Sequence, residues 1–252
     1  MGNEMILLDG FPLTGPLREG MWKRIGELEG WFDSPDPKRK SVSRENGDGS
    51  YPSEINFESR LITFTGRVTS KSHDYLHEAG NRLVALPGRG GKQFVVKGHG
   101  PTQEATVDPR GKVSITFPTD TRMEFQIPLE AVDPYKYGER RYTTVSSGGS
   151  ETVFHRGTVE AWPSVSVSGD MPDGYTVTIG GQSVSVPMGI PSGVTHTIDY
   201  RRRRLYINGS LFMGAFGSQN FRSIAPGLRT TVSLSAPSGS GTAGVTIYDT
   251  YI

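Results

Sequence analysis

The chain of 252 residues contains no cysteine. This absence excludes disulfide bridges, thiolate zinc sites, iron–sulfur clusters and cysteine nucleophiles. The sequence also has no apolar run near the length of about 18 residues that a membrane helix needs. Its first residues, MGNEMILLDG, lack the basic and then apolar pattern of a signal peptide. We therefore expect a soluble protein that is made in the cytoplasm and does not insert into a membrane.

An excess of charge of either sign is also missing, because 27 basic residues face 26 acidic ones. This balance disfavours a strongly basic nucleic-acid-binding protein and an acidic disordered tail. Turn-forming residues, in contrast, are abundant, with 33 Gly and 17 Pro. So many turn formers argue against a helical bundle or a coiled coil. The composition favours a mainly β protein.

The distribution of charge predicts two domains, at residues 1–130 and 131–252. The first part carries 17 basic and 18 acidic side chains, whereas the second carries 10 and 8 and is rich in Ser and Thr. Lys136 is the only lysine after residue 130. A length of 252 residues fits either one large β domain or two smaller domains, and the change in composition favours two.

The first domain is predicted to be an α+β module that forms a small barrel or folded sheet around one helix. Apolar, β-branched and aromatic residues indicate strands at 5–8, 55–57, 61–68, 93–97, 112–117 and 123–129. Apolar residues at helical spacing predict a helix with Thr69 or Ser70 as its N-cap, ended by Pro87-Gly88. Residues 31–54 form a long polar excursion, which predicts either disorder or an arm that is ordered against a neighbouring molecule.

The second domain is predicted to be a β-sandwich. Polar and apolar residues alternate at 164–168, 175–179 and 183–186, and further strands are expected at 194–199, 205–207, 211–213, 231–234 and 245–251. Gly180-Gly181 and Asn208-Gly209 lie between such segments and predict tight hairpins. Short strands at this spacing are typical of two packed sheets.

No group of residues assembles a recognisable catalytic site. His73 and His77 are four residues apart, but the His-Glu-x-x-His pattern of a zinc protease is absent, so an exposed helix face is favoured over a metal site. The segment 88–92 lacks the spacing of a phosphate-binding loop. The eight acidic residues of the second domain lie mostly at turns, whereas glycoside hydrolysis needs two facing carboxylates. We expect no enzymatic activity, no metal and no cofactor.

Two features remain as candidate contacts with a partner. The run Arg201-Arg202-Arg203-Arg204 lies where a hairpin turn is expected, and a solvated turn or subunit contact is favoured there over nucleic-acid recognition. Trp162 and Tyr175 could stack on a sugar, although single aromatic residues of a sandwich are more often part of its core.

The order of motifs along the chain resembles the distal tail protein (Dit) family of long-tailed, non-contractile phages, and in particular the minor tail proteins of actinobacterial phages. The matching segments extend over most of the chain. They are Asn46–Tyr51, Phe57–Val68, the helix with Leu83, Phe125–Gly138, His155-Arg156-Gly157-Thr158, Pro163, Ile198–Tyr200, Leu205–Gly209, Ala225-Pro226-Gly227 and Val245–Tyr251.

The resemblance implies a structural virion protein at the distal end of the tail. In this family the first domain forms a ring, usually a hexamer, with an arm that reaches the next subunit, and the second domain is a galectin-like sandwich. The ring would join the tail tube protein to the tail hub, and the tape measure protein and later DNA would pass through its lumen without sequence-specific recognition. The family has no catalytic residues to transfer.

On this basis we expect the arm to contact the neighbouring subunit through Trp31, Phe32, Arg39, Arg44 and Tyr51. The alternative hypothesis is a module of the tail tip that binds host cell-wall glycan through Trp162 and Arg201, Arg202, Arg203 and Arg204. A tail-associated glycan hydrolase is a third, less favoured hypothesis, because no pair of carboxylates has a recognisable context.

Overall fold

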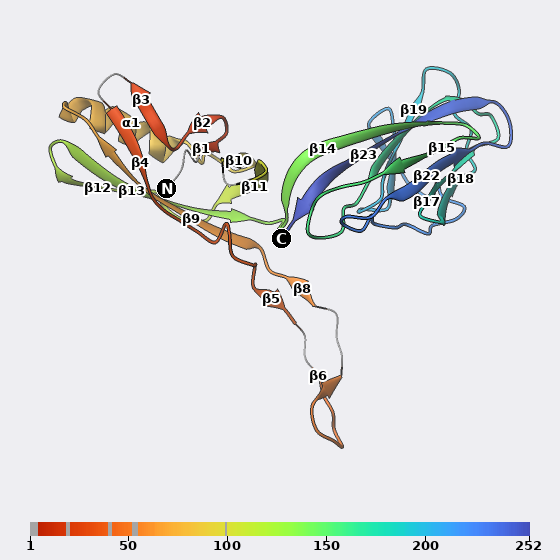
Figure 1. Ribbon diagram of the computed structural model, residues 1–252, viewed down its shortest axis with the longest axis horizontal. Helices are drawn as coiled ribbons and strands as arrows, with labels where there is room; N and C mark the ends of the chain where they lie inside the picture. Colours follow the sequence, from red (N-terminus) through yellow and green to blue (C-terminus); the bar gives the residue numbers. More distant parts are fainter. Residues whose placement is uncertain (1–4, 19–20, 40–41, 52–54, 99) are drawn as a thin grey trace. The chain divides into compact units, whose positions relative to one another are not determined.

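The computed structural model describes residues 5–18, 21–39, 42–51, 55–98 and 100–252. It separates into two compact units, Met1–Lys136 together with Ile252, and Tyr137–Tyr251 (Figure 1). Strands dominate both units, so the prediction of a mainly β protein is confirmed. No helix among the described residues is long and apolar enough to cross a membrane.

The first unit is built on an antiparallel sheet with the strand order β11-β13-β9-β4-β3. Its longest ladder joins β9 to β13, from Arg60↔Ala131 to Thr69↔Arg122. Strand β12 extends the sheet beside β13, and a second ladder joins β2, β1, β10 and β11. The strands are β1 Met5–Leu8, β2 Phe11–Pro12, β3 Gly15–Arg18, β4 Met21–Glu29, β9 Arg60–Thr69, β10 Lys92–Lys97, β11 Gln103–Pro109, β12 Ser114–Thr119 and β13 Arg122–Ala131.

One helix, α1 (His73–Ala85), packs on this sheet through Leu76, Ala79 and Leu83. The prediction of Thr69 or Ser70 as N-cap is wrong, because the cap is Ser72. Thr69 ends β9, and the Ser70 hydroxyl accepts a hydrogen bond from the Ser72 N–H (3.1 Å), which turns the chain before the helix starts.

Gly80 lets α1 approach the sheet closely. A Cβ at this position would lie 3.3 Å from Ile115 Cδ1 and 3.3 Å from Met123 Sδ, tighter than an ordinary van der Waals contact. The glycine lowers helix propensity by about 1 kcal/mol relative to alanine, but it allows closer packing of the helix on β12 and β13.

The second unit is a sandwich of two antiparallel sheets (Figure 1). One sheet has the order β21-β20-β19-β16-β23-β14 and the other the order β15-β22-β17-β18. Their facing side chains, mostly Val, Ile and Leu with Tyr175 and Tyr200, form one buried core. The strands are β14 Lys136–Ser146, β15 Ser150–Val153, β16 Ser164–Asp170, β17 Tyr175–Ile179, β18 Gln182–Val186, β19 Thr195–Asp199, β20 Arg204–Ile207, β21 Ser210–Phe212, β22 Thr230–Ser235 and β23 Ser240–Tyr251.

Both predicted hairpins are present. Gly180 and Gly181 join β17 to β18, where Ile179 pairs with Gln182. Asn208 and Gly209, both with positive φ (46° and 84°), join β20 to β21 in the same way. Two central residues with positive φ match the type I′ turn, whose twist suits a two-residue hairpin.

Candidate functional site at the arm and its root

The polar excursion folds into a hairpin arm, defined here as residues 32–58, which leaves the first unit between β4 and β9 (Figure 1). Strand β5 (Pro37–Lys38) pairs with β8 (Asn56–Phe57), and β6 (Val42–Ser43) pairs with β7 (Ser50–Tyr51). The Glu58 N–H donates to the Asp36 carbonyl oxygen (2.8 Å). Positions 40–41 and 52–54 of the predicted arm lie outside the described residues.

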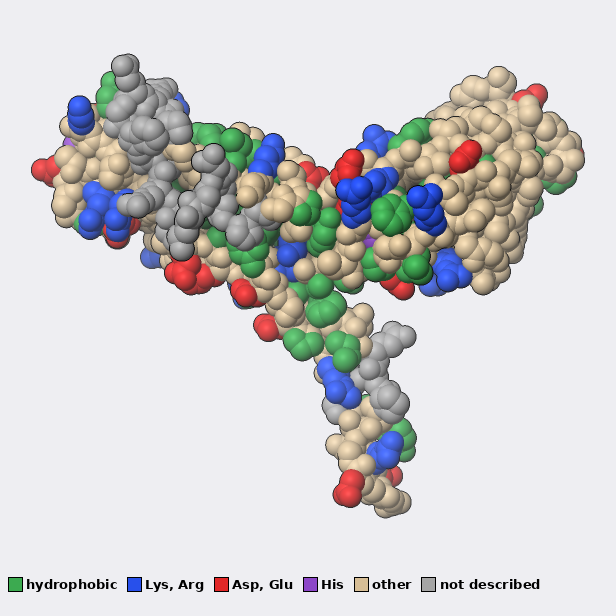
Figure 2. Space-filling view, viewed as in Figure 1, with side chains coloured by type: hydrophobic (Ala, Val, Ile, Leu, Met, Phe, Trp, Pro, Cys, Tyr) green, Lys and Arg blue, Asp and Glu red, His purple; other side chains and the backbone are tan. Residues whose placement is uncertain are grey.

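The arm exposes apolar side chains along its length. Phe32, Val42, Tyr51 and Ile55 are each more than half exposed. The Arg44 guanidinium lies 5.7 Å from the centroid of the Tyr51 ring, and Arg39 is exposed. Figure 2 shows hydrophobic and basic side chains along the projecting hairpin. A narrow hairpin has no core of its own, so apolar side chains on it are available to another surface.

The prediction for Trp31 is wrong. Its side chain is fully buried, and its ring lies 5.2 Å from that of Phe94, centroid to centroid, in the core of the first unit. Trp31 anchors the start of the arm and does not present its ring to another subunit. Of the five residues predicted for an inter-subunit contact, Phe32, Arg39, Arg44 and Tyr51 are on the exposed arm, and their role stays a prediction.

A buried arginine holds the start of the arm. Arg60, at the first position of β9, is 1% exposed. Its Nη1 donates to the carbonyl oxygens of Gly30 (2.8 Å), Trp31 (3.3 Å) and Asp33 (2.6 Å), while its Nε donates to that of Pro134 (3.0 Å). One guanidinium thus ties the segment that enters the arm to the segment that follows β13. We call this group, Gly30–Asp33, Arg60 and Pro134–Lys136, the arm root.

Glycine is required at the entry to the arm. Gly30 has φ +75°, and a Cβ there would overlap the carbonyl oxygen of Leu61. The left-handed conformation turns the chain away from β4 and directs the Gly30 carbonyl oxygen at Arg60.

A second buried cation completes the arm root. The Lys136 Nζ donates to the Trp31 carbonyl oxygen (3.0 Å) and lies 5.6 Å from the centroid of the Trp31 ring. Burial, together with the positive charge of Arg60, lowers the pKa of Lys136 to about 8, although Asp33 acts to raise it. Burial also lowers the pKa of Arg60. The two cations are held mainly by backbone carbonyl dipoles.

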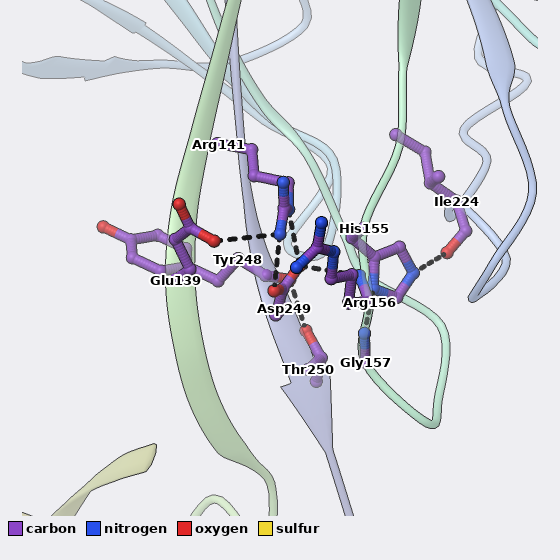
Figure 3. Close-up of polar contacts among 9 residues, drawn as sticks. All are labelled: Glu139, Arg141, His155, Arg156, Gly157, Ile224, Tyr248, Asp249 and Thr250. Atoms are coloured by element: carbon purple, nitrogen blue, oxygen red, sulfur yellow. Dashed lines mark hydrogen bonds and ion pairs between the residues drawn. The ribbon is translucent and has the colours of Figure 1, made fainter. Parts of the chain in front are cut away.

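The second unit contains a polar network that joins β14 to β23 (Figure 3). Asp249, 3% exposed, accepts from Arg141 at both carboxylate oxygens (Nε to Oδ1, 2.8 Å; Nη2 to Oδ2, 2.9 Å). The Arg156 backbone N–H also donates to Asp249 Oδ1 (2.8 Å), and Glu139 accepts from Arg141 (3.0 Å). Burial acts to raise the pKa of Asp249, but the bonds from Arg141 and Arg156 outweigh it and the pKa is lowered.

The segment His155–Thr158 is fixed against β23 by this network. His155 is fully buried, its Nε2 lies 3.0 Å from the Ile224 carbonyl oxygen, and its Nδ1 accepts from the Gly157 N–H (3.2 Å). Because Nδ1 accepts, the ring nitrogen that donates is Nε2, toward the Ile224 carbonyl oxygen. The Thr158 N–H donates to the Thr250 carbonyl oxygen (2.9 Å). The sequence motif is therefore a structural clamp on the end of β23.

The residues of the glycan hypothesis lie at different kinds of position. Trp162 is 38% exposed, whereas Tyr175 is buried in the sandwich core. The arginine run forms the turn between β19 and β20: Arg201 donates to the Tyr137 hydroxyl (2.7 Å), the Arg202 N–H donates to Asp199 (2.9 Å), Arg203 has φ +54°, and Arg204 begins β20. A role for these residues in binding stays a prediction.

His73 and His77 face each other on the exposed side of α1. Their Nε2 atoms are 2.9 Å apart, and both rings pack against Phe117. In the part of the chain that the structure describes, no three His, Cys, Asp or Glu side chains are grouped so that they could hold a metal ion.

Comparison with known proteins identifies the fold. The chain is similar to the crystal structure of the SPP1 Dit (gp 19.1) protein, described as a paradigm of the hub adsorption apparatus in phages that infect Gram-positive bacteria. The TM-score is 0.75 at 14% sequence identity, and the match covers 100% of both chains. A chain of the phage p2 baseplate in its activated conformation with Sr matches with a TM-score of 0.51 at 8% identity, covering 97% of this chain and 98% of that one.

The resemblance to Dit is therefore confirmed at the level of the fold. No protein-family model matches the sequence, and no curated protein does.

Separate substitutions of Trp31 and of its neighbour Phe32 distinguish a residue buried in the arm root from one on the exposed arm. We expect Trp31→Ala to lower the free energy of unfolding by about 3–5 kcal/mol, because it leaves a cavity in a packed core. Phe32→Ala, at a position 52% exposed, should change it by less than about 0.5 kcal/mol. Urea unfolding followed by far-UV circular dichroism measures both; equal losses would contradict the assignment of Trp31 to the core.

Lys136 should make stability rise with pH in the alkaline range. Its pKa is about 8 in the fold and ordinarily 10.5, so the unfolded chain binds more protons between these values and stability increases as pH rises through them. The full gain is about 3 kcal/mol. Urea unfolding at pH 7.5, 9 and 10 should show this rise in the parent chain but not in Lys136→Met. Subtracting the free energy of unfolding of Lys136→Met from that of the parent at each pH removes the contribution of the other titrating groups. Parallel pH profiles of the two chains would contradict the prediction.

Asp249 should act in the opposite pH range. Its lowered pKa means that its contribution is complete above the ordinary value of 3.8 and is lost as pH falls through the lowered value. Asp249→Asn should therefore cost about 2 kcal/mol at pH 7, because Arg141 loses a charged partner, and the gap between parent and variant should narrow as pH falls below 3.8. Thermal unfolding at pH 7 and at a series of lower pH values tests this; a gap that stays constant over the series would show that the cost is not electrostatic.

Proposed function

We propose that this chain is a structural protein of a phage tail tip: a distal tail protein whose first unit closes into a ring, with six subunits expected. The observation that carries the proposal is the arm, an exposed hairpin that presents apolar side chains and is mounted on a buried root. The fold of the SPP1 Dit protein, whose description places that protein in a hub adsorption apparatus, supports the same interpretation.

The arm has the properties of an element made for another surface. Its described strand pairs join only residues of the arm itself, so its outer edges can add to a neighbouring sheet. Phe32, Val42, Tyr51 and Ile55 would lose exposed apolar area in such a contact. The rigid root would give every subunit the same arm direction, and one repeated head-to-tail contact closes a ring.

In this proposal the ring joins the tail tube to the tail hub, and its lumen passes the tape measure protein and then DNA. The role is geometric and non-enzymatic. The charged groups whose pKa values shift most in the first unit, Arg60 and Lys136, hold the arm root. The sandwich would support peripheral proteins of the tail tip. Binding of host glycan by the sandwich remains the alternative, supported by the partial exposure of Trp162.

Shortening the arm tests the proposal. Lys38 and Asn56 form the last pair of the β5–β8 ladder, so residues 39–55 can be replaced by Asn-Gly, which suits a two-residue hairpin. The full chain, 27.5 kDa, is expected to form six-chain particles, and the shortened chain is expected to be a folded monomer because the whole arm root is kept. Light scattering behind a sizing column measures both masses.

A second arm variant and a matched control make the result of shortening the arm interpretable. Val42→Ser with Ile55→Ser retains the length of the arm and should weaken the ring, because it removes exposed apolar area without touching the root. Asp48→Asn, at an exposed polar position near the tip of the arm, should leave the ring intact. A ring of unchanged mass after replacement of residues 39–55 would show that the arm does not close it.

A further inference from the structure

Strand β21 is an apolar edge strand, and among the described residues it is paired on one side only. It ends its sheet, and β20 is the strand that pairs with it in the described structure. Leu211, Phe212 and the following Met213 are 46%, 42% and 77% exposed. Three consecutive exposed apolar residues on an edge strand and directly after it are a liability for a folded protein unless another chain covers them.

The register shows which backbone groups of this edge are available. Next to the type I′ turn, Ile207↔Ser210 is the hydrogen-bonded pair, so the following pair, Tyr206↔Leu211, is not hydrogen-bonded. The bond from the Asn208 N–H to the Thr195 carbonyl oxygen (2.9 Å) fixes the same alternation from the other side of β20. The N–H and C=O of Leu211 therefore point away from β20, toward the position of an additional strand.

The surroundings of this edge are basic. Arg201–Arg203 form the turn before β20 and Arg204 is the first residue of that strand, next to the pair Leu205↔Phe212. Asp199 is an acidic residue that this turn engages. An added strand would lie about 10 Å from β20, two strand spacings away, which is about the screening length at 0.1 M salt. Acidic side chains on that strand would be attracted to the turn.

We propose that β21 binds an extended segment of a partner protein by β-strand addition, and that this segment carries apolar side chains and acidic residues. Leu211 supplies the main-chain bonds, Leu211 and Met213 supply apolar contact, and the arginine turn selects negative charge. A second copy of β21 is a poorer occupant, because residues 200–221 contain four arginines and no acidic residue.

This surface is independent of ring closure. It lies on the sandwich, whereas the proposed ring contact uses residues 32–58. The chain in which Asn-Gly replaces residues 39–55 should therefore keep its affinity for the partner segment, and the two proposals fail or succeed separately.

Proline at position 211 provides a selective test. The N–H of Leu211 makes no ladder bond to β20, and proline is tolerated on an edge strand where the N–H faces solvent. Leu211→Pro therefore removes the outward donor without removing a bond of the hairpin. Leu211→Thr is the matched control, because it keeps the N–H and the β propensity and removes only apolar contact.

The probe is a fluorescein-labelled nine-residue peptide of alternating Glu and Val, with its Lys-Val counterpart, titrated with the full chain and followed by fluorescence anisotropy. We expect the acidic peptide to bind at least about tenfold more tightly than the basic one at low salt. Leu211→Pro should weaken binding at least about tenfold, Leu211→Thr should weaken it less, and Arg203→Gln with Arg204→Gln should reduce the preference for the acidic peptide.

Hydrogen exchange of the full chain, read from its proteolytic fragments that cover residues 205–214, locates the contact. Slower exchange at Leu211 on addition of the acidic peptide supports strand addition. Equal affinities for parent and Leu211→Pro, or equal affinities for both peptides, would overturn the proposal. If the arm-shortened chain self-associates and its Leu211→Pro variant does not, this loss would make a second copy of the chain the occupant, in place of a partner protein. If Leu211→Pro unfolds the sandwich, the Arg203 and Arg204 variant and the exchange data still decide the outcome.

Discussion

The arm depends on the burial of a single guanidinium, that of Arg60. It reaches from the start of β9 to the two other segments of the arm root, Gly30–Asp33 and Pro134–Lys136, and it donates to four backbone carbonyl oxygens. A planar group with five donors can do this at several angles at once, which a lysine ammonium on a flexible stem does less well. The direction in which the hairpin leaves the first unit follows from this contact and from the left-handed conformation of Gly30.

The second cation of the arm root, Lys136, adds hydrogen bonding to the root but also adds the free-energy cost of burying another positive charge. Two positive charges are buried near each other, and carbonyl dipoles of Gly30, Trp31, Asp33 and Pro134 replace the solvation that water would give. Such a site loses stability when one donor is removed, because the remaining carbonyl oxygens stay buried. The free energy of unfolding rises when Lys136 loses its proton, and the lowered pKa of Lys136 expresses this preference of the fold for the neutral amine.

The sequence predicted elements wherever local chemistry was sufficient. Gly180-Gly181 and Asn208-Gly209 adopt the positive φ angles that their hairpins require, and strict alternation located β16, β17 and β18. Strand β14 escaped prediction because only two of its eleven residues are buried, Lys136 and Val145, so it shows no apolar period. The start of β23 escaped because Gly244, which reads as a break, makes room for the Tyr142 ring on the adjacent strand.

Trp31 shows a different limit of the sequence. An aromatic residue at the start of a polar excursion has the same composition whether it anchors the excursion or projects from it, and only the position of Phe94 and Lys136, distant in the chain, decides between the two. The adjacent Phe32 has the opposite exposure. The same logic applies to β21, where exposure of Leu211 follows from a ladder that ends at β20 and not from the residue itself. In both cases the surface available to a partner is defined by what the fold leaves uncovered, which local sequence does not encode.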